Sequence, residues 1–121
     1  MSVLIVGGAG FIGSVLVEEM LPRDIDIIVI DKLSLGSADY INTNKVELHQ
    51  VDINNINQVL EILKDRKIDE VWHLAANSDI PAGVENMDVD LDDTFMSTVS
   101  ILKIMKKIHC KKLYFASSSA V

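Results

Sequence analysis

Short apolar runs alternate with amphipathic stretches along the chain. A continuous apolar run of about four to eight residues is typical of a buried strand, and apolar residues three and four positions apart are typical of a helix. On this basis strands are predicted over Ser2–Val6 and Ile25–Ile30. Val46–Val51, Glu70–Leu74 and Leu113–Ala116 are also predicted to be strands.

The segments between these strands carry helical patterns or loop signals. Apolar residues are helically spaced in Phe11–Leu21, and Pro22 ends that pattern. A second helix with a cap at Asn54 or Asn55 carries apolar positions at Ile56, Val59, Leu60 and Leu63. The third predicted helix, Asp88–Ile108, is acidic at its start and basic at its end. Loops are predicted for Asp31–Asn44, with one helical turn around Asp39–Ile41, and for Ala75–Met87.

Alternation of strands and helices indicates an α/β domain with a parallel sheet. Crossovers between parallel strands are right-handed, so helices are expected on both faces of the sheet. The predicted fold is a doubly wound sheet in the order 3-2-1-4-5. The length of 121 residues is that of one domain, so residues 1–121 are expected to form a single unit.

Four of the six glycines lie in the segment GGAGFIG, Gly7–Gly13, between the first predicted strand and helix. Gly7, Gly10 and Gly13 give G-x-x-G-x-x-G, and a start at Gly8 gives G-x-G-x-x-G. Glycines in this context permit a tight turn, an approach of the backbone to a pyrophosphate, and close packing of the helix on the strand. The following helix presents free N–H groups to phosphates, so the segment predicts dinucleotide binding.

Asp31 ends the second predicted strand, 21 residues after Gly10. A carboxylate at this point accepts hydrogen bonds from an adenosine ribose and repels a 2′-phosphate, which favours NAD over NADP. Taken alone, Asp31 is equally well interpreted as a solvated loop residue. Lys32, which follows it, places a cation beside the same ribose and weakens the preference for NAD.

Four further motifs accompany the glycine segment: IDKLSLGS (Ile30–Ser37), VDI (Val51–Ile53), HLAANSD (His73–Asp79) and FASSSAV (Phe115–Val121). With them, the whole chain resembles the N-terminal portion of the NAD-dependent epimerase/dehydratase family, the extended branch of the short-chain dehydrogenase/reductases. The resemblance implies a Rossmann-type fold and an enzyme that holds NAD and acts on a nucleotide-sugar, a UDP- or dTDP-hexose. Such enzymes oxidise the C4 hydroxyl by hydride transfer to NAD; whether epimerisation, dehydration or another outcome follows stays open.

The resemblance also implies cofactor-binding roles for individual residues. Gly7, Gly10 and Gly13 form the phosphate loop, to which Phe11 and Ile12 contribute backbone N–H groups. Asp31 is the ribose carboxylate. The other implied contacts are Lys32 beside the adenosine, where the family usually has asparagine, Asp52 and Ile53 at the adenine, and Leu74, Ala75 and Ala76 at the end of the fourth strand.

In the family, a Tyr-x-x-x-Lys pair and a serine or threonine four residues before the tyrosine carry the chemistry. Ser118 is the catalytic hydroxyl if tyrosine follows Val121, and Ser78 falls in the loop that faces the substrate. The tyrosine and lysine are expected beyond Val121, so the chain is expected to bind NAD without turnover of its own. The sheet is expected to be truncated after its fifth strand, which leaves a strand edge and apolar surface open, so the chain is also expected to self-associate.

Two other interpretations remain open at this stage. One is a non-catalytic dinucleotide sensor that keeps the glycine loop and lacks the tyrosine and lysine. The other is an atypical reductase that uses NADPH on a carbonyl compound other than a sugar. The residues that follow Val121 would separate the first from an enzyme, and the measured cofactor preference would separate the second.

Composition narrows the remaining choices. With 18 acidic and 11 basic residues the formal charge is −7, which argues against nucleic acid and against an anionic membrane surface as partners. No apolar run approaches the ~20 residues of a membrane span. Cys110 is the one cysteine, and no secretory signal is recognisable, so a cytoplasmic location is expected. No metal site is expected, and His73 is interpreted as a hydrogen-bonded histidine of the core or of the sheet end.

Helix 88–108 also predicts a contact between subunits. Its apolar positions spread over roughly half of the helix circumference, which is somewhat more than packing on one sheet requires. Two interpretations apply, a well-buried helix or an outer edge that pairs with a second subunit, as the equivalent helix does in the family. We expect a homodimer through this helix. The acids between Asp88 and Asp93 are interpreted as residues of the helix start and a solvated face.

Overall fold

The computed structural model describes residues 1–33, 37–76 and 84–117. Within them lies a parallel sheet of five strands in the order β3-β2-β1-β4-β5, so the predicted order 3-2-1-4-5 is confirmed. Each strand matches its predicted range to within one residue at either end. The strands are β1 (Ser2–Val6), β2 (Asp26–Asp31), β3 (Glu47–Gln50), β4 (Glu70–His73) and β5 (Leu113–Phe115).

The central strand β1 is buried on both faces, as is usual where helices cover both sides of a parallel sheet. Successive side chains of a strand point to opposite faces. Val3 and Ile5 accordingly pack in one core cluster, and Leu4 and Val6 pack in the other. The run of apolar residues that predicted this strand therefore serves two cores.

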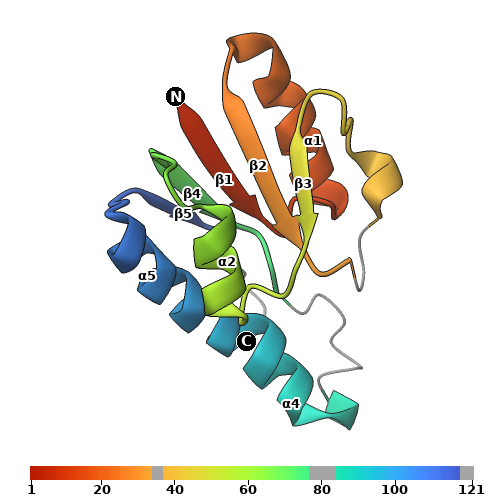
Figure 1. Cartoon of the computed structure of the whole chain (residues 1–121). Helices are drawn as coiled ribbons and strands as arrows, with labels where there is room; N and C mark the ends of the chain where they lie inside the picture. Colours follow the sequence, from red (N-terminus) through yellow and green to blue (C-terminus); the bar gives the residue numbers. More distant parts are fainter. Residues whose placement is uncertain (34–36, 77–83, 118–121) are drawn as a thin grey trace.

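Helices cover the two faces unequally (Figure 1). On one face lies α1 (Phe11–Met20), followed by the 3₁₀ turn η1 (Leu21–Arg23) that contains Pro22. On the other lie α2 (Ile56–Ile62) and α5 (Ser97–Ile108), which contact each other. The predicted turn in the loop after β2 is the short 3₁₀ helix η2 (Ala38–Tyr40).

The third predicted helix differs from its expectation in one respect. It runs through α4 (Met87–Asp90) and α5, but the segment between them, η3 (Leu91–Met96), is π-helical. The Ser97 hydroxyl lies 2.8 Å from the carbonyl oxygen of Asp93 and 2.9 Å from that of Thr94. A side-chain hydroxyl that bonds to the preceding turn competes with the backbone amides for those carbonyls and distorts the helix. Hydrophobic periodicity does not reveal this widened turn.

Candidate functional site

A cleft of about 340 Å³ lies at the carboxyl ends of the strands. This is the edge of an open α/β sheet where ligands bind, at the point where the strand order reverses between β1 and β4. The cleft is lined by every residue for which a cofactor contact was expected: Gly7, Gly10, Phe11, Ile12, Gly13, Asp31, Lys32, Asp52, Ile53, Leu74, Ala75 and Ala76. The structure thus brings together residues from four separate segments of the chain.

The first glycine has a backbone conformation that other residues rarely adopt. Gly7 has φ +82°, and a Cβ built there would lie 2.6 Å from the backbone nitrogen of Ala75. Its amide donates a 2.8 Å hydrogen bond to the carbonyl oxygen of Ile30. The loop after β1 is therefore held between the ends of β2 and β4, and a side chain would push it away from both.

Gly13 and Gly10 serve different purposes. A Cβ on Gly13 would lie 2.5 Å from the Cα of Gly8, so this glycine lets α1 pack closely on the loop. At Gly10 the nearest described atom to such a Cβ is the carbonyl oxygen of Gly7, at 3.6 Å. The space beside Gly10 is therefore open to the cleft rather than filled by protein.

The start of α1 offers hydrogen-bond donors to that space. Gly10 is the N-cap and supplies no side chain to cap the helix. The first N–H groups of an α-helix have no acceptor within the helix, so those of Phe11 and Ile12 are available to a ligand. A Cβ-free approach beside an uncapped, positively polarised helix end suits a pyrophosphate.

Asp31 is oriented by backbone amides on both of its oxygens. The amide of Ala9 donates to Oδ2 at 3.0 Å, and that of Leu33 donates to Oδ1 at 2.7 Å. Each carboxylate oxygen accepts more than one hydrogen bond, so capacity remains for two hydroxyl donors. The side chain is therefore fixed in place before any ligand is present.

Asp52 and Ile53 follow β3 on the same side of the cleft. Oδ1 of Asp52 accepts a 2.9 Å hydrogen bond from the amide of Asn54, and the exposed carboxylate retains its second oxygen for another donor. Ile53 is buried and closes the floor beside it. This arrangement can bind a flat base with an exocyclic amine.

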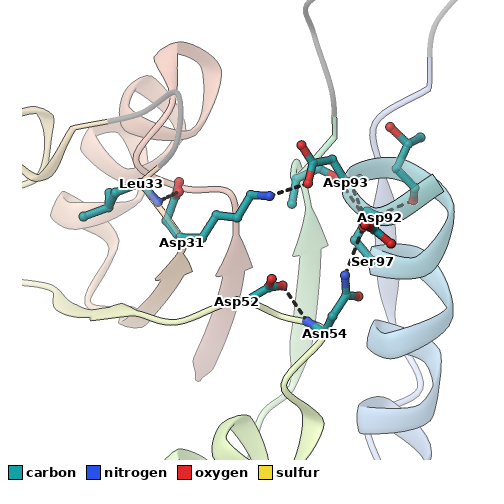
Figure 2. Close-up of polar contacts among 10 residues, drawn as sticks. Asp31, Leu33, Asp52, Asn54, Asp92, Asp93 and Ser97 are labelled. Atoms are coloured by element: carbon teal, nitrogen blue, oxygen red, sulfur yellow. Dashed lines mark hydrogen bonds and ion pairs between the residues drawn. The ribbon is translucent and has the colours of Figure 1, made fainter. Parts of the chain in front are cut away.

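The opposite wall of the cleft was not anticipated from the sequence. Figure 2 shows Asp92 and Asp93 on the helix that faces Asp31 and Asp52. The ammonium of Lys32 donates to the Asp93 carboxylate. The side-chain amide nitrogen of Asn54, Nδ2, donates to the backbone carbonyl oxygen of Asp92 at 3.0 Å. The other unanticipated lining residues are Val6, Ile30, Val51, Ser97 and Ala116.

Some of these residues left a usable signal in the sequence. Val6, Ile30 and Val51 stand at or next to the predicted strand ends, and ligands in open α/β sheets bind at the carboxyl ends of strands. Asp92 and Asp93 left none, because acids near a helix start are sufficiently explained by the helix dipole. Their position in the cleft depends on tertiary structure.

Two expected site residues, Ser78 and Ser118, lie outside the described residues. The nearest described part of the last motif is Ala116, which lines the cleft and donates a 3.2 Å hydrogen bond to the carbonyl oxygen of His73. The end of β5 is thus joined to the end of β4 at the cleft.

His73 occupies the core, in agreement with its interpretation. It is 2% exposed, and its Nε2 lies 2.8 Å from the Thr98 hydroxyl. Burial lowers the pKa of His73 below its usual value. Over residues 1–33, 37–76 and 84–117, no three His, Cys, Asp or Glu side chains are arranged to hold a metal ion.

Comparison with known families shows to which family the chain belongs. A model described as the NAD dependent epimerase/dehydratase family matches residues 3–121. The chain belongs to that family. The resemblance inferred from the motifs is therefore confirmed over nearly all of the sequence.

Members of the epimerase/dehydratase family with close similarity include the UDP-glucose 4-epimerase of Lactobacillus helveticus, 38% identical over 120 residues. The match covers 99% of this chain and 36% of that protein. Among solved structures, UDP-glucose 4-epimerase of Thermotoga maritima with UDP-glucose superimposes with a TM-score of 0.92 at 28% identity, over 98% of this chain and 38% of that one. The Thermus thermophilus enzyme in complex with NAD gives 0.90 at 30% identity, over 98% and 38%.

The chain therefore spans less than two fifths of the length of these relatives. Helices long and apolar enough to cross a membrane do not occur in the part of the chain that the structure describes.

Proposed function

We propose that this chain is the NAD-binding portion of a nucleotide-sugar epimerase of the UDP-glucose 4-epimerase type. The observation that carries the proposal is the cleft itself. A glycine cradle, an uncapped helix start and an oriented carboxylate converge there at the strand ends. The relatives named above are UDP-glucose 4-epimerases, and the Thermus thermophilus structure contains NAD.

In this proposal the phosphate and adenosine parts of NAD lie along the loop after β1 and the ends of β2 and β3. The amides of Phe11 and Ile12 donate to the pyrophosphate, and Gly10 leaves the room for it. Asp31 accepts from the ribose hydroxyls. Asp52 accepts from the adenine amine, while Ile53 packs against the base.

The end of β4 takes the other half of the dinucleotide. Leu74, Ala75 and Ala76 present small and apolar surface to the cleft, which suits a flat nicotinamide ring and excludes water from it. Bound NAD supplies an acceptor for the hydride removed from the substrate carbon. Ser78 and Ser118 are proposed to face the substrate, a UDP- or dTDP-hexose, with Ser118 as the hydroxyl that binds the reacting oxygen.

The 121 residues do not contain a Tyr-x-x-x-Lys pair, because Tyr40 and Tyr114 are followed four positions later by Asn44 and Ser118. A serine hydroxyl is a weak nucleophile and base unless a neighbouring group activates it. We therefore propose that this chain binds NAD and does not by itself oxidise a sugar.

Calorimetric titration of the 121-residue chain with NAD tests the first part of the proposal. Saturable binding of one NAD per chain is expected, with NADP bound more weakly. A folded chain, shown by circular dichroism, that takes up no NAD would overturn the assignment.

Absorbance at the reduced-nicotinamide band tests the second part. No reduction of bound NAD is expected from the 121-residue chain with UDP-glucose or UDP-galactose. Reduction would show that this chain contains its own base. A protein that continues this chain with a Tyr-x-x-x-Lys pair is expected to turn over, and its inertness would favour a dinucleotide sensor.

We also propose a homodimer through the helix that runs from Met87 to Ile108. Leu91, Phe95 and Leu102 are 47%, 61% and 52% exposed on it. Phe95 lies in the π-helical segment and Leu102 in α5, so exposed apolar side chains occur in both parts of this helix. Large apolar side chains that stay exposed close together are typical of an interface.

A further inference from the structure

One ion pair spans the cleft. Lys32 directly follows Asp31 at the end of β2, and its ammonium donates to Oδ1 of Asp93 in η3. The two residues are 61 positions apart in the sequence, and both line the cleft. Their side chains are 40% and 20% exposed, so the pair lies at the mouth of the cleft rather than in the core.

Asp93 is held in position from its own side of the cleft. Its carbonyl oxygen lies 2.8 Å from the Ser97 hydroxyl, and the carbonyl of Asp92 accepts from Asn54 at 3.0 Å. Asn54 is itself fixed, because its Oδ1 accepts a 2.8 Å hydrogen bond from Ser100. The carboxylate that engages Lys32 thus belongs to a braced turn, which directs the lysine toward the helix.

The charges around the ion pair determine what a phosphate group on the ribose would meet in the cleft. Among the described lining residues, Lys32 is the one cation, beside the carboxylates of Asp31, Asp52, Asp92 and Asp93. In dinucleotide-binding folds a basic side chain near the ribose accommodates the 2′-phosphate of NADP. Lysine also binds phosphate well as a point charge. With Lys32 engaged by Asp93, a 2′-phosphate would meet carboxylates and find no free cation.

We propose that Asp93 is a specificity-determining residue of the cofactor site: by holding and neutralising Lys32, it preserves the preference for NAD over NADP. The proposal rests on the proposed function, namely that this cleft binds NAD. Asp31 excludes the 2′-phosphate only as long as the adjacent lysine is engaged elsewhere. Loss of the Asp93 charge would release Lys32 to the ribose.

Dissociation constants for NAD and NADP, measured by calorimetry at low ionic strength, test the proposal in four proteins: wild type, Asp93→Asn, Lys32→Gln and the double variant. Asp93→Asn is expected to raise the affinity for NADP relative to NAD by roughly tenfold, the effect of one charge-assisted hydrogen bond. Lys32→Gln leaves the Asp93 carboxylate unpaired in the cleft and is expected to move the ratio in the opposite direction. The double variant should return near the wild-type ratio.

The two single variants are expected to change the NADP to NAD ratio in opposite directions. This distinguishes a role of Asp93 in cofactor specificity from a purely structural role of the ion pair. Both single substitutions break the same ion pair, so a pair that only supports the fold would change NAD and NADP binding alike in both. Asp88→Asn, which removes the same charge from an exposed position of the same helix outside the lining residues, is the matched control and should leave the ratio unchanged. The expected shift in Asp93→Asn should also shrink as salt screens the charges.

An unchanged NADP to NAD ratio in Asp93→Asn, with NAD still bound by the wild type, would overturn the role of Asp93 and leave the proposed function intact. If Asp93→Asn does not fold, Asp93→Ser takes its place, because it removes the same charge and should raise the NADP to NAD ratio in the same direction. A folded wild type that binds neither nucleotide would overturn the proposed function and this inference together.

Discussion

The backbone amide of Ala9 donates a 3.0 Å hydrogen bond to the carboxylate of Asp31. This bond connects the glycine loop to the end of β2, the two segments proposed to hold the pyrophosphate and the ribose. Because one side chain organises both, a change at Asp31 should affect binding through the loop as well as through the lost ribose contact.

Asp31→Ala is expected to weaken NAD binding by about 1.5–3 kcal/mol, the range for a hydrogen bond to a charged group. Calorimetry on the variant and the wild type measures the loss. Asp26→Ala, at the other end of the same strand, is the control and should bind NAD normally. Equal affinity of the wild type for NADP and NAD would contradict the role given to Asp31.

Gly10→Val is expected to abolish NAD binding and to preserve the fold. Gly10 has φ −79° and ψ −178°, an extended conformation open to any residue, and its Cβ would meet no described atom closer than 3.6 Å. The branched side chain would occupy the space proposed for the pyrophosphate. Calorimetry and thermal unfolding together measure the two effects.

Gly13→Val provides the contrast for that experiment. Its Cβ would lie 2.5 Å from the Cα of Gly8, so the helix would have to move away from the loop. Overpacking of this kind costs about 1–3 kcal/mol of stability. Should Gly10→Val titrate with NAD at unchanged affinity, the loop does not bind the phosphates.

Much of the architecture could be predicted from local sequence. Segments such as Ile25–Ile30, which is apolar except for Asp26, admit few alternatives, and the right-handed crossover rule then limits the strand order. The glycine loop was equally accessible, because the spacing of three glycines between a strand and a helix is visible in the sequence, although the close approach of Gly7 to Ala75 is not. The π-helical turn was not, because the spacing of apolar residues carries no signal for one extra residue in a helical turn.

The Lys32–Asp93 pair was inaccessible for a different reason. A side chain that meets a partner 61 positions away leaves no periodic signal, and either residue alone is an ordinary solvated charge. The sequence predicted that Lys32 would complicate cofactor choice, without indicating what holds it. Only the packing of the long helix against the strand ends brings the two together.

Acid should destabilise the protein through His73. Burial lowers the pKa of His73 below its usual value near 6.5, so the unfolded chain binds a proton more readily than the folded one. The corresponding stability is present above pH 6.5 and declines as the pH falls below it, by at most about 1.4 kcal/mol per pH unit. Urea unfolding between pH 7.5 and 5.5 measures this slope.

His73→Phe removes the titrating group and should flatten that pH dependence. His109→Asn, at an exposed position with φ 58° that asparagine tolerates, should retain it. A slope that survives in His73→Phe would assign the acid sensitivity to other groups.

Leu102→Glu is expected to yield a monomer. A charge among the exposed apolar side chains of the helix cannot be buried in an interface without a large desolvation cost. Sedimentation velocity of wild type and variant measures the association state. Lys103→Glu, one position along and about 100° around the helix, is the control and should still associate. A wild type that sediments as a monomer at high concentration would contradict the proposed dimer.

The π-helical turn over Leu91–Met96 also lies between two parts of one helix, of which one packs in the core and the other lines the cleft. Beyond it, Ile101 and Met105 are fixed in the core against the sheet. Before and within it, the orientation of Asp92 and Asp93 depends on the extra residue of the wide turn. Deletion of one residue there would rotate the acidic segment by roughly 100° relative to the buried one. Insertions and deletions in this turn would therefore remodel the end of the cleft proposed to bind adenosine while the hydrophobic core keeps its packing.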